Sequence, residues 1–320
     1  MVAQTSEQSN VFSSSSRKYR SGKKVELATG RAECRDEWSI GIYSGESPVQ
    51  IAPAPNVKNP VLTWEDVTDI PARFVADPFM IRVNHEWYMF FEVMNRENGK
   101  GEIGLAVSDD ALSWKYQQIV LAESYHLSYP YVFEWLNEYY MIPESYMAGG
   151  VRLYKATSFP TKWSFAGTLL AGPYYADPSV LRYQNKWWLF VDASPAIQHD
   201  TLRLFWAETL SGVWFEHPRS PIVLGNPHIA RPAGRLIMLG DKLIRFAQDC
   251  YPTYGNQVYA FEITQLSTTE YQEQEMSKSP VIKASGAGWN QSGMHQIDPH
   301  PTEGGRWIAC VDGLCWKPTT

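Results

Sequence analysis

Acidic residues stand at matching places along the chain, beside prolines. Asp77 and Asp177 each precede a proline in an Ala-Asp-Pro step, and Glu144 ends an apolar run in a Pro-Glu-Ser step. Carboxyl groups in different surroundings can act as general acid and general base on a glycosidic bond, because the environment decides which one keeps its proton. This pattern predicts Asp77, Asp177 and Glu144 as the catalytic carboxyl groups.

Further polar residues occupy equivalent positions in other copies of the same pattern. The residue before the proline is Asp, Tyr, Asp or Arg in four copies, and a looser fifth copy begins at His295. An Asx turn at the strand entry would explain the aspartates structurally, but it would favour one residue type throughout. The varied chemistry therefore favours a site, with Arg231 suited to a carboxylate, a phosphate or sugar hydroxyls. The predicted substrate-binding residues are Glu92, Tyr129, Asp192, Arg231, Gln248, Asp249, His295 and Asp312.

The elements that must position these residues repeat at a spacing of about 50 residues. Each copy runs into an apolar hairpin, and in three copies a second hairpin follows whose signature ends in Trp114, Trp163 or Trp214. Four antiparallel strands per repeat are typical of propeller blades. The sequence therefore predicts an all-β fold, a single five-bladed β-propeller over residues 31–320 with a central pocket. Residues 37–43 alternate as a strand does and are expected to close the ring by joining the last blade.

The hairpin geometry predicts where the polar residues meet. If residue 83 pairs with 87, residue 78 lies opposite 92, and Asp77 and Glu92 come together at one mouth of the channel. The same register brings Tyr129 to Glu144 and Asp177 to Asp192. In the longer hairpins Arg231 is expected near Gln248 and Asp249, and His295 near Asp312. Five polar pairs should therefore share one rim.

Composition narrows the classes of partner. The net charge is −6, so nothing favours a nucleic-acid backbone as ligand, and 13 Trp, 18 Tyr and 13 Phe can serve core packing or sugar stacking. Residues 1–30 are polar and are expected to form a disordered tail. The sequence contains no apolar stretch long enough for a signal peptide or a membrane span, so we expect a soluble, cytoplasmic protein. The oligomeric state stays open.

The four cysteines, Cys34, Cys250, Cys310 and Cys315, do not have the spacing of a zinc site. We expect reduced thiols. A disulfide between Cys310 and Cys315, or between Cys34 and Cys310, remains an alternative if the protein is exported.

The Asp-Pro steps of the first and third copies resemble the five-bladed propellers of glycoside hydrolase families 43, 32, 68 and 130. In those propellers the first-blade aspartate is the base or nucleophile, which would be Asp77 here. A closer resemblance, over about residues 37–316, is to the propeller domain at the N-terminal side of plant glucosamine inositolphosphorylceramide transferases and its stand-alone bacterial relatives. It lies in the motifs Ala-Arg-Pro-Ala-Gly-Arg at 230–235, Ala-Gln-Asp-Cys at 247–250, Tyr-Gly at 254–255, Gly-Met-His at 293–295 and Val-Asp-Gly at 311–313.

The resemblance also has limits that matter for function. The plant transferase activity belongs to a separate domain, so it is not implied for this segment. The hydrolases present a glutamate acid from the fourth blade, where this chain has Arg231 and then Gln248 and Asp249; Glu144 or Asp249 could replace it. Some family 43 relatives hold Ca²⁺ in the channel near a fifth-blade histidine, so His295 is a candidate metal ligand, although a hydrogen-bonded core histidine is the alternative. No other cofactor is expected.

Three functions follow from these observations. The first is a hydrolase or related enzyme that acts on a glycosidic bond of a carbohydrate or glycoconjugate. The second is a glycan-binding module without catalysis that works with a separate glycosyltransferase. The third is a propeller recruited for non-sugar chemistry in a small-molecule pathway, because one fold hosts many functions.

Overall fold

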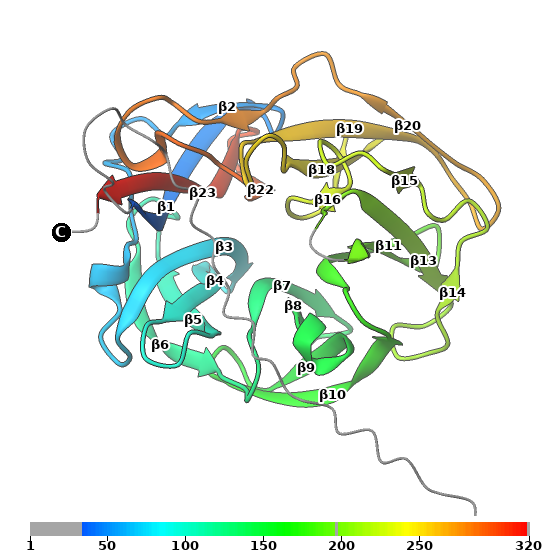
Figure 1. Ribbon diagram of the computed structural model, residues 1–320, viewed down its shortest axis with the longest axis horizontal. Helices are drawn as coiled ribbons and strands as arrows, with labels where there is room; N and C mark the ends of the chain where they lie inside the picture. Colours follow the sequence, from blue (N-terminus) through cyan, green and yellow to red (C-terminus); the bar gives the residue numbers. More distant parts are fainter. Residues whose placement is uncertain (1–33, 196–197, 319–320) are drawn as a thin grey trace, which may run out of the picture.

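A computed structural model describes residues 34–195 and 198–318, so the predicted tail over residues 1–30 lies outside the described residues. Five antiparallel sheets surround a common centre, which confirms the five-bladed propeller (Figure 1). Blade 1 comprises β3 (Ala72–Val83), β4 (Glu86–Asn95), β5 (Gly101–Ser108) and β6 (Lys115–Leu121). Blade 2 comprises β7 (Ser128–Trp135), β8 (Glu138–Glu144), β9 (Gly150–Ser158) and β10 (Lys162–Ala171).

The third and fourth blades have shorter, interrupted strands. Blade 3 comprises β11 (Ala176–Tyr183), β12 (Lys186–Asp192), β13 (Thr201–Ala207), β14 (Phe215–Glu216) and β15 (Val223–Leu224), the last two both pairing with β13. Blade 4 comprises β16 (Arg231–Pro232), β17 (Ile237–Leu239), β18 (Lys242–Asp249), β19 (Gln257–Leu266), β20 (Tyr271–Glu275) and β21 (Ile282–Lys283). The described helices are the 3-10 turns η1 (Trp64–Asp66), η2 (Tyr146–Ala148) and η4 (Gly288–Asn290).

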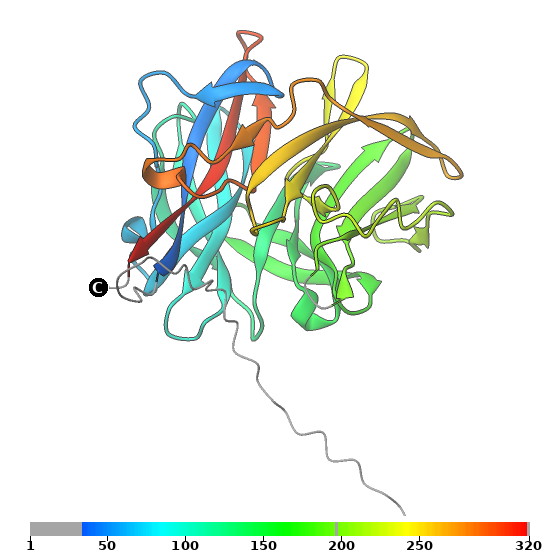
Figure 2. The same cartoon turned by 45° about the horizontal axis from the view of Figure 1, so that its top comes forward.

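Blade 5 joins the two ends of the described chain. It comprises β22 (Ile297–Pro301), β23 (Trp307–Pro318), β1 (Cys34–Ser47) and β2 (Gln50–Pro53). β1 pairs with β23 in an unbroken antiparallel register in which Ile40 lies opposite Asp312. The blue and red strands lie side by side in both views (Figures 1 and 2). The prediction that residues 37–43 close the ring is therefore confirmed.

The predicted hairpin register is wrong by one residue between the turn and Phe79, and by two residues at the strand entry. Val83 pairs with Glu86 across a two-residue turn, and Ala76, not Pro78, lies opposite Glu92. The shorter turn accounts for one of these residues, and a bulge between Ala76 and Phe79, which adds one residue on the inner strand, accounts for the other. Equivalent bulges follow Ser128 and Ala176, which lie opposite Glu144 and Asp192. Alternation of side chains cannot reveal such an insertion.

The repeated tryptophans explain the second hairpin of the first three blades. The indole nitrogens of Trp114, Trp163 and Trp214 donate hydrogen bonds to the carbonyls of Ala111, Pro160 and Leu210, at 3.1, 2.9 and 3.1 Å. Each ring covers the turn that leads into the outer strand and packs on the hydrophobic core between blades. These three tryptophans therefore contribute to core packing, the one of the two predicted uses of aromatic residues that needs no sugar ligand.

Two glycines make room for a tryptophan beneath the closing strand. A Cβ at Gly313 would lie 2.5 Å from both the Trp289 ring and the Cβ of Asn290, and one at Gly41 would lie 2.5 Å from the same indole. We expect Gly313→Ala to lower the free energy of unfolding by about 1–3 kcal/mol, because overpacking forces the ring or the strand to shift. Urea unfolding measures this. Gly304→Ala, at an open turn position, is the control and should change stability by less than about 0.5 kcal/mol; equal effects would contradict the packing argument.

Two remaining sequence predictions can be compared with the described residues. Cys310 is a buried free thiol whose sulfur lies 3.3 Å from the Pro78 carbonyl oxygen, so neither of the two disulfides considered, both of which use Cys310, is present. Cys250 is also a free thiol. Among the helices of residues 34–195 and 198–318, none has the length and apolar character needed to cross a bilayer.

Candidate active site

The inner-strand bulges place three predicted residues at the centre. Asp77, Tyr129 and Asp177 all have left-handed backbones, with φ of 53°, 45° and 50°. This conformation is costly for residues other than glycine, and such strain concentrates at functional sites. All three residues are buried. The bulges thus turn the residue before each proline toward the axis of the ring.

Carboxylates of one blade accept the bulge amides of the next. The Asp77 N–H donates to Asp312 Oδ2 at 3.1 Å, the Tyr129 N–H to Asp77 Oδ2 at 3.2 Å, and the Asp177 N–H to Glu144 Oε2 at 3.3 Å. The strained backbone is therefore held in place by the acidic residues themselves. Three predicted site residues, Asp77, Glu144 and Asp312, thus serve the structure as well as any chemistry.

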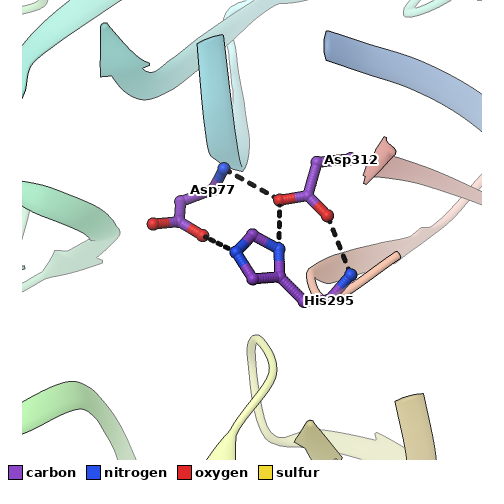
Figure 3. Close-up of side chains that lie close together, drawn as sticks. All are labelled: Asp77, His295 and Asp312. Atoms are coloured by element: carbon purple, nitrogen blue, oxygen red, sulfur yellow. Dashed lines mark hydrogen bonds and ion pairs between the residues drawn. The ribbon is translucent and has the colours of Figure 1, made fainter. Parts of the chain in front are cut away.

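One charge cluster consists of Asp77, His295 and Asp312 (Figure 3). His295 Nδ1 lies 2.6 Å from Asp312 Oδ2, and His295 Nε2 lies 3.5 Å from Asp77 Oδ1. The second Asp312 oxygen accepts the backbone N–H of His295 at 3.0 Å. The imidazole therefore lies between two carboxylates, as the predicted pairing of His295 with Asp312 requires.

Aromatic rings enclose His295. The Trp38 ring, from β1, stacks on the imidazole at 4.0 Å between centroids and 18° between planes. Tyr254 approaches the same imidazole edge-on at 5.3 Å, and its ring also lies 5.3 Å from the Arg231 guanidinium. Tyr254 is 40% exposed, whereas Trp38, Arg231 and His295 are 5%, 8% and 3% exposed. Tyr254 therefore separates the central charges from solvent.

The other charge cluster is organised by Arg231. Its guanidinium holds Asp177 through two bonds, Nε to Oδ2 at 2.5 Å and Nη2 to Oδ1 at 3.1 Å, and also donates to Glu144 Oε2 at 3.2 Å. Gln248 donates to Asp177 Oδ2 at 2.6 Å. Two parallel bonds between a guanidinium and a carboxylate are strong and fix orientation. Arg231 also pairs with Gln248 in the backbone register, as predicted.

The two clusters give their carboxyl groups different proton affinities. Burial raises the pKa of Asp77 to about 7, against the opposing charge of His295. Burial also raises the pKa of Glu144 well above its usual range, with the Asp177 charge adding to the effect. Burial would raise the pKa of Asp177 too, but the charge of Arg231 outweighs it and lowers that pKa. Asp177 is therefore held in its anionic form, whereas burial favours the protonated form of Glu144.

The pKa of His295 is shifted in the direction that favours its protonated form. Burial acts to lower its pKa, but the charge and hydrogen bond of Asp312 and the charge of Asp77 raise it above the ordinary histidine value. Five of the buried carboxyl groups among the described residues belong to the same centre as Arg231 and His295. They are Asp77, Glu92, Glu144, Asp177 and Asp312.

The side chains of two predicted binding residues, Tyr129 and Asp249, make hydrogen bonds that stabilise the fold. The Tyr129 hydroxyl hydrogen-bonds Ser179 Oγ at 2.7 Å and accepts the Gly234 N–H at 2.6 Å, which ties blades 2, 3 and 4 together. Asp249 accepts from the Tyr251 N–H, Asn256 and Gln257 and pairs with His228. Its observed contacts are with His228 and with residues 251–257 rather than with the central clusters.

Two other predicted residues, Asp192 and Glu92, lie beside histidines that no sequence pattern marks as site residues. Asp192 Oδ2 lies 3.3 Å from His199 Nδ1, which is 2.9 Å from Arg231 Nη1. Glu92 Oε1 lies 3.5 Å from His126 Nε2. Both histidines come from loops, where no periodicity marks a position. The available signal for His126 is its place two residues before Ser128, which begins the second copy of the repeat and the strand β7.

The donors around His295 do not fit a calcium ion. Ca²⁺ takes six to eight oxygen ligands at about 2.3–2.6 Å. Asp77, His295 and Asp312 offer one potential ligand atom each within 4.8 Å of one another, but His295 Nδ1 already contacts Asp312 at 2.6 Å. The imidazole occupies the space between the carboxylates and supplies positive charge there.

The fold and site define a class: a five-bladed propeller with an acidic centre, the architecture of many glycoside hydrolases. Solved structures agree on the fold. A putative glycosidase from Bacteroides thetaiotaomicron has a TM-score of 0.61 at 10% identity, covering 83% of this chain and 97% of that one. A thermostable family-43 glycoside hydrolase has a TM-score of 0.56 at 13% identity, with 83% and 96% covered.

The family itself follows from sequence comparison. Residues 31–314 match the family described as glucosamine inositolphosphorylceramide transferase 1, N-terminal, and the chain belongs to this family. It is 36% identical over 298 residues to glucosamine inositolphosphorylceramide transferase 1 of Oryza sativa subsp. japonica, covering 86% of this chain and 40% of the relative. The Arabidopsis thaliana protein of the same name is 32% identical over 316 residues, covering 91% and 41%. The chain thus spans about two fifths of the length of these relatives.

The structure explains why glycine stands in two of the family motifs, Tyr-Gly at 254–255 and Gly-Met-His at 293–295. A Cβ at Gly255, which has φ of 69°, would lie 2.7 Å from the Trp38 ring and 3.2 Å from His295 Cβ. A Cβ at Gly293 would lie 2.2 Å from the Gly255 carbonyl oxygen. The two glycines let the Tyr254 loop pack directly on the His295 segment. The Tyr-Gly and Gly-Met-His motifs therefore describe one contact at the edge of the site.

Proposed function

We propose that this propeller is a carbohydrate-active enzyme that acts on a glycosidic bond. Its substrate would be a carbohydrate or glycoconjugate, in line with the names of the plant relatives and of the glycosidases that share its fold. The observation that carries the proposal is the division of one buried centre into an Asp77–His295–Asp312 cluster and an Arg231–Asp177–Glu144 cluster. The pKa values of their carboxyl groups are shifted in opposite directions within one site, upward for Asp77 and Glu144 by burial and downward for Asp177 by the charge of Arg231.

The geometry supports distinct roles. Asp77 would act as base or nucleophile, with His295 oriented behind it by Asp312. Asp177, held by two bonds to Arg231, would remain anionic and stabilise positive charge that develops on the sugar ring. The leaving oxygen needs a proton, and two buried carboxyls with raised pKa, Glu92 and Glu144, are able to supply it.

The test is product release from a panel of aryl glycosides and natural oligosaccharides, with ligand binding followed by calorimetry in parallel. The wild-type chain is expected to turn over at least one substrate class. Asp110→Asn, in the turn between β5 and β6 where Asp110 caps Leu112 and Ser113, should match wild-type turnover. Absence of turnover across the panel by the wild type would refute hydrolysis.

A second function, glycan binding without turnover, is favoured by one observation. Arg231 stands in the fourth blade, where the hydrolases present their acid, and it already neutralises Asp177 and contacts Glu144. A binding module would show saturable heat with oligosaccharides and no product. In that case there is no turnover for Asp77→Asn to abolish, and the substitution would instead weaken the binding of the oligosaccharide.

A further inference from the structure

Glu92 differs from the other acidic residues of the centre. Asp177, Glu144 and Asp312 accept hydrogen bonds from named donors, and Asp77 accepts the Tyr129 N–H. Glu92 is 6% exposed, yet no donor among the described residues makes a hydrogen bond to its carboxyl group. Its one polar contact there is His126 Nε2 at 3.5 Å. A buried carboxyl without donors is stable mainly in its protonated form.

The surroundings of His126 keep its imidazole neutral, so its contact with Glu92 involves no positive charge. His126 Nδ1 accepts the backbone N–H of Gly101 at 2.8 Å, so the ring proton of the neutral imidazole lies on Nε2, toward Glu92. Burial, together with the charge of Arg231, lowers the pKa of His126 to about 4. The ring therefore does not supply the positive charge that would ionise Glu92.

Gly101 makes this arrangement possible. A Cβ at this position would lie 2.8 Å from Glu92 Oε1, 2.8 Å from the His126 ring and 2.2 Å from the Leu127 carbonyl oxygen. The glycine at the start of β5 thus brings the loop before β7 against β4. The contact between Glu92 and His126 is therefore built by the backbone of blade 1 and the entry to blade 2.

We propose that Glu92 is the general acid of the site, with His126 as the residue that positions it. This inference rests on the proposed function. Glu144, the acid predicted from sequence, lies 3.2 Å from the Arg231 guanidinium and accepts the Asp177 N–H, and both contacts favour its ionised form. Glu92 has neither contact, and it is surrounded by the charges of Asp77, Glu144, Asp177 and Asp312, which together with burial raise its pKa.

The proton balance of the reaction is complete with these residues. As the glycosidic C–O bond breaks, the Glu92 O–H proton passes to the leaving oxygen. Water that attacks the anomeric carbon, directly or after a covalent step on Asp77, gives its proton to a carboxylate. Exchange with solvent then returns Glu92 to the protonated form, so one water is consumed and no oxidant or metal is needed.

The experiment compares Glu92→Gln and Glu144→Gln on aryl glycosides with leaving groups of increasing acidity. If Glu92 is the acid, Glu92→Gln should lose about 10²–10⁴-fold in turnover on poor leaving groups and far less on a dinitrophenyl leaving group, which departs without a proton. Glu144→Gln should show one loss for all leaving groups. The reverse pattern would assign the acid to Glu144 and overturn the proposal.

Glu102→Gln is the matched control. Glu102 is a buried glutamate of blade 1 that accepts hydrogen bonds from Asn95 and Asn98, both at 3.0 Å, and its loss should leave the leaving-group dependence as in the wild type. Infrared difference spectra provide a measurement that does not need turnover. Glu92→Gln should remove a protonated-carboxyl band at neutral pH, and the same band should persist in Glu102→Gln.

The two measurements separate the two claims. Turnover by the wild type with no leaving-group effect in Glu92→Gln, or an ionised Glu92 in the spectra, would overturn the acid role alone. Absence of turnover by the wild type would overturn the proposed function together with any acid.

Discussion

Asp77→Asn should reduce turnover by about 10²–10⁴-fold while substrate binding persists. The amide oxygen of asparagine can still accept the Tyr129 N–H that Asp77 Oδ2 accepts at 3.2 Å, so the bulge should survive. It cannot take a proton or attack carbon. In the wild type, kcat/KM should rise with pH through about 7, because burial raises the pKa of Asp77 to that value and the base must be ionised.

The same substitution should affect stability in the opposite direction. Because the folded-state pKa of Asp77 is raised, its contribution to stability is present at pH below 4 and is lost as pH rises through about 7. Asp77→Asn removes this loss, so it should be more stable than the wild type above pH 7 by about 1 kcal/mol or more, with a smaller difference at pH 5. Turnover within tenfold of the wild type, or an unchanged stability difference between pH 5 and 8, would show that Asp77 is neither the base nor a destabilised carboxyl.

Arg231→Met should be among the most destabilising single substitutions in the chain, with a loss of about 3–5 kcal/mol at pH 7. It leaves Asp177 and Glu144, 1% and 5% exposed, without the cation that both contact. Asp177 has a lowered pKa because of Arg231, so its stabilising contribution is present above its ordinary pKa and is lost as pH falls through the folded value. The loss in free energy of unfolding should therefore be smaller at pH 5, where Asp177 and Glu144, left without a counterion, take up protons.

Urea unfolding of three variants would test this interpretation. Asp177→Asn together with Arg231→Met should recover part of the loss, because the uncompensated charge is then gone. Arg219→Met removes an exposed ion pair with Glu270, whose side chains are 61% and 41% exposed, and should cost no more than about 1 kcal/mol. If Arg231→Met and Arg219→Met were equally mild, Arg231 would not be the counterion of the site.

The sequence predicted the blades and the convergence of residues from different blades, but not the exact contacts. The prolines, the alternating hairpins and the strand at 37–43 are local patterns, and blade number and ring closure follow from their repetition. The turn after Val83 is one residue shorter than predicted, and the bulge between Ala76 and Phe79 inserts one more residue, so the predicted register was wrong along this hairpin. Arg231 and Asp177 are 54 residues apart in sequence, and no local pattern reveals that they bind each other.

Residues on loops were the hardest to predict. His126, His199 and Tyr254 lie outside the strands, so neither periodicity nor the proline step marks them. Trp38 was visible within a predicted strand, but its contact with His295 depends on how the closing strand packs. The side chain of Tyr129 stands at a predicted site position yet turns to Ser179 and Gly234. The position of a residue in the repeat thus predicted that it lies near the centre. Its hydrogen-bond or stacking partner, however, depends on the three-dimensional packing.

The closing strand β1 has a consequence for the order of folding. Trp38 arrives on β1, and its stacking partner His295 and the Asp312 carboxylate belong to the opposite end of the described chain. Contacts between residues so far apart in sequence form late, because the entropy of closing a long loop must be overcome first. The first four blades can form from neighbouring hairpins, but the Asp77–His295–Asp312 cluster exists only after the ring closes. Any activity of this centre would therefore report the last step of folding, and a chain that stops short of closure would have its blades but no assembled site.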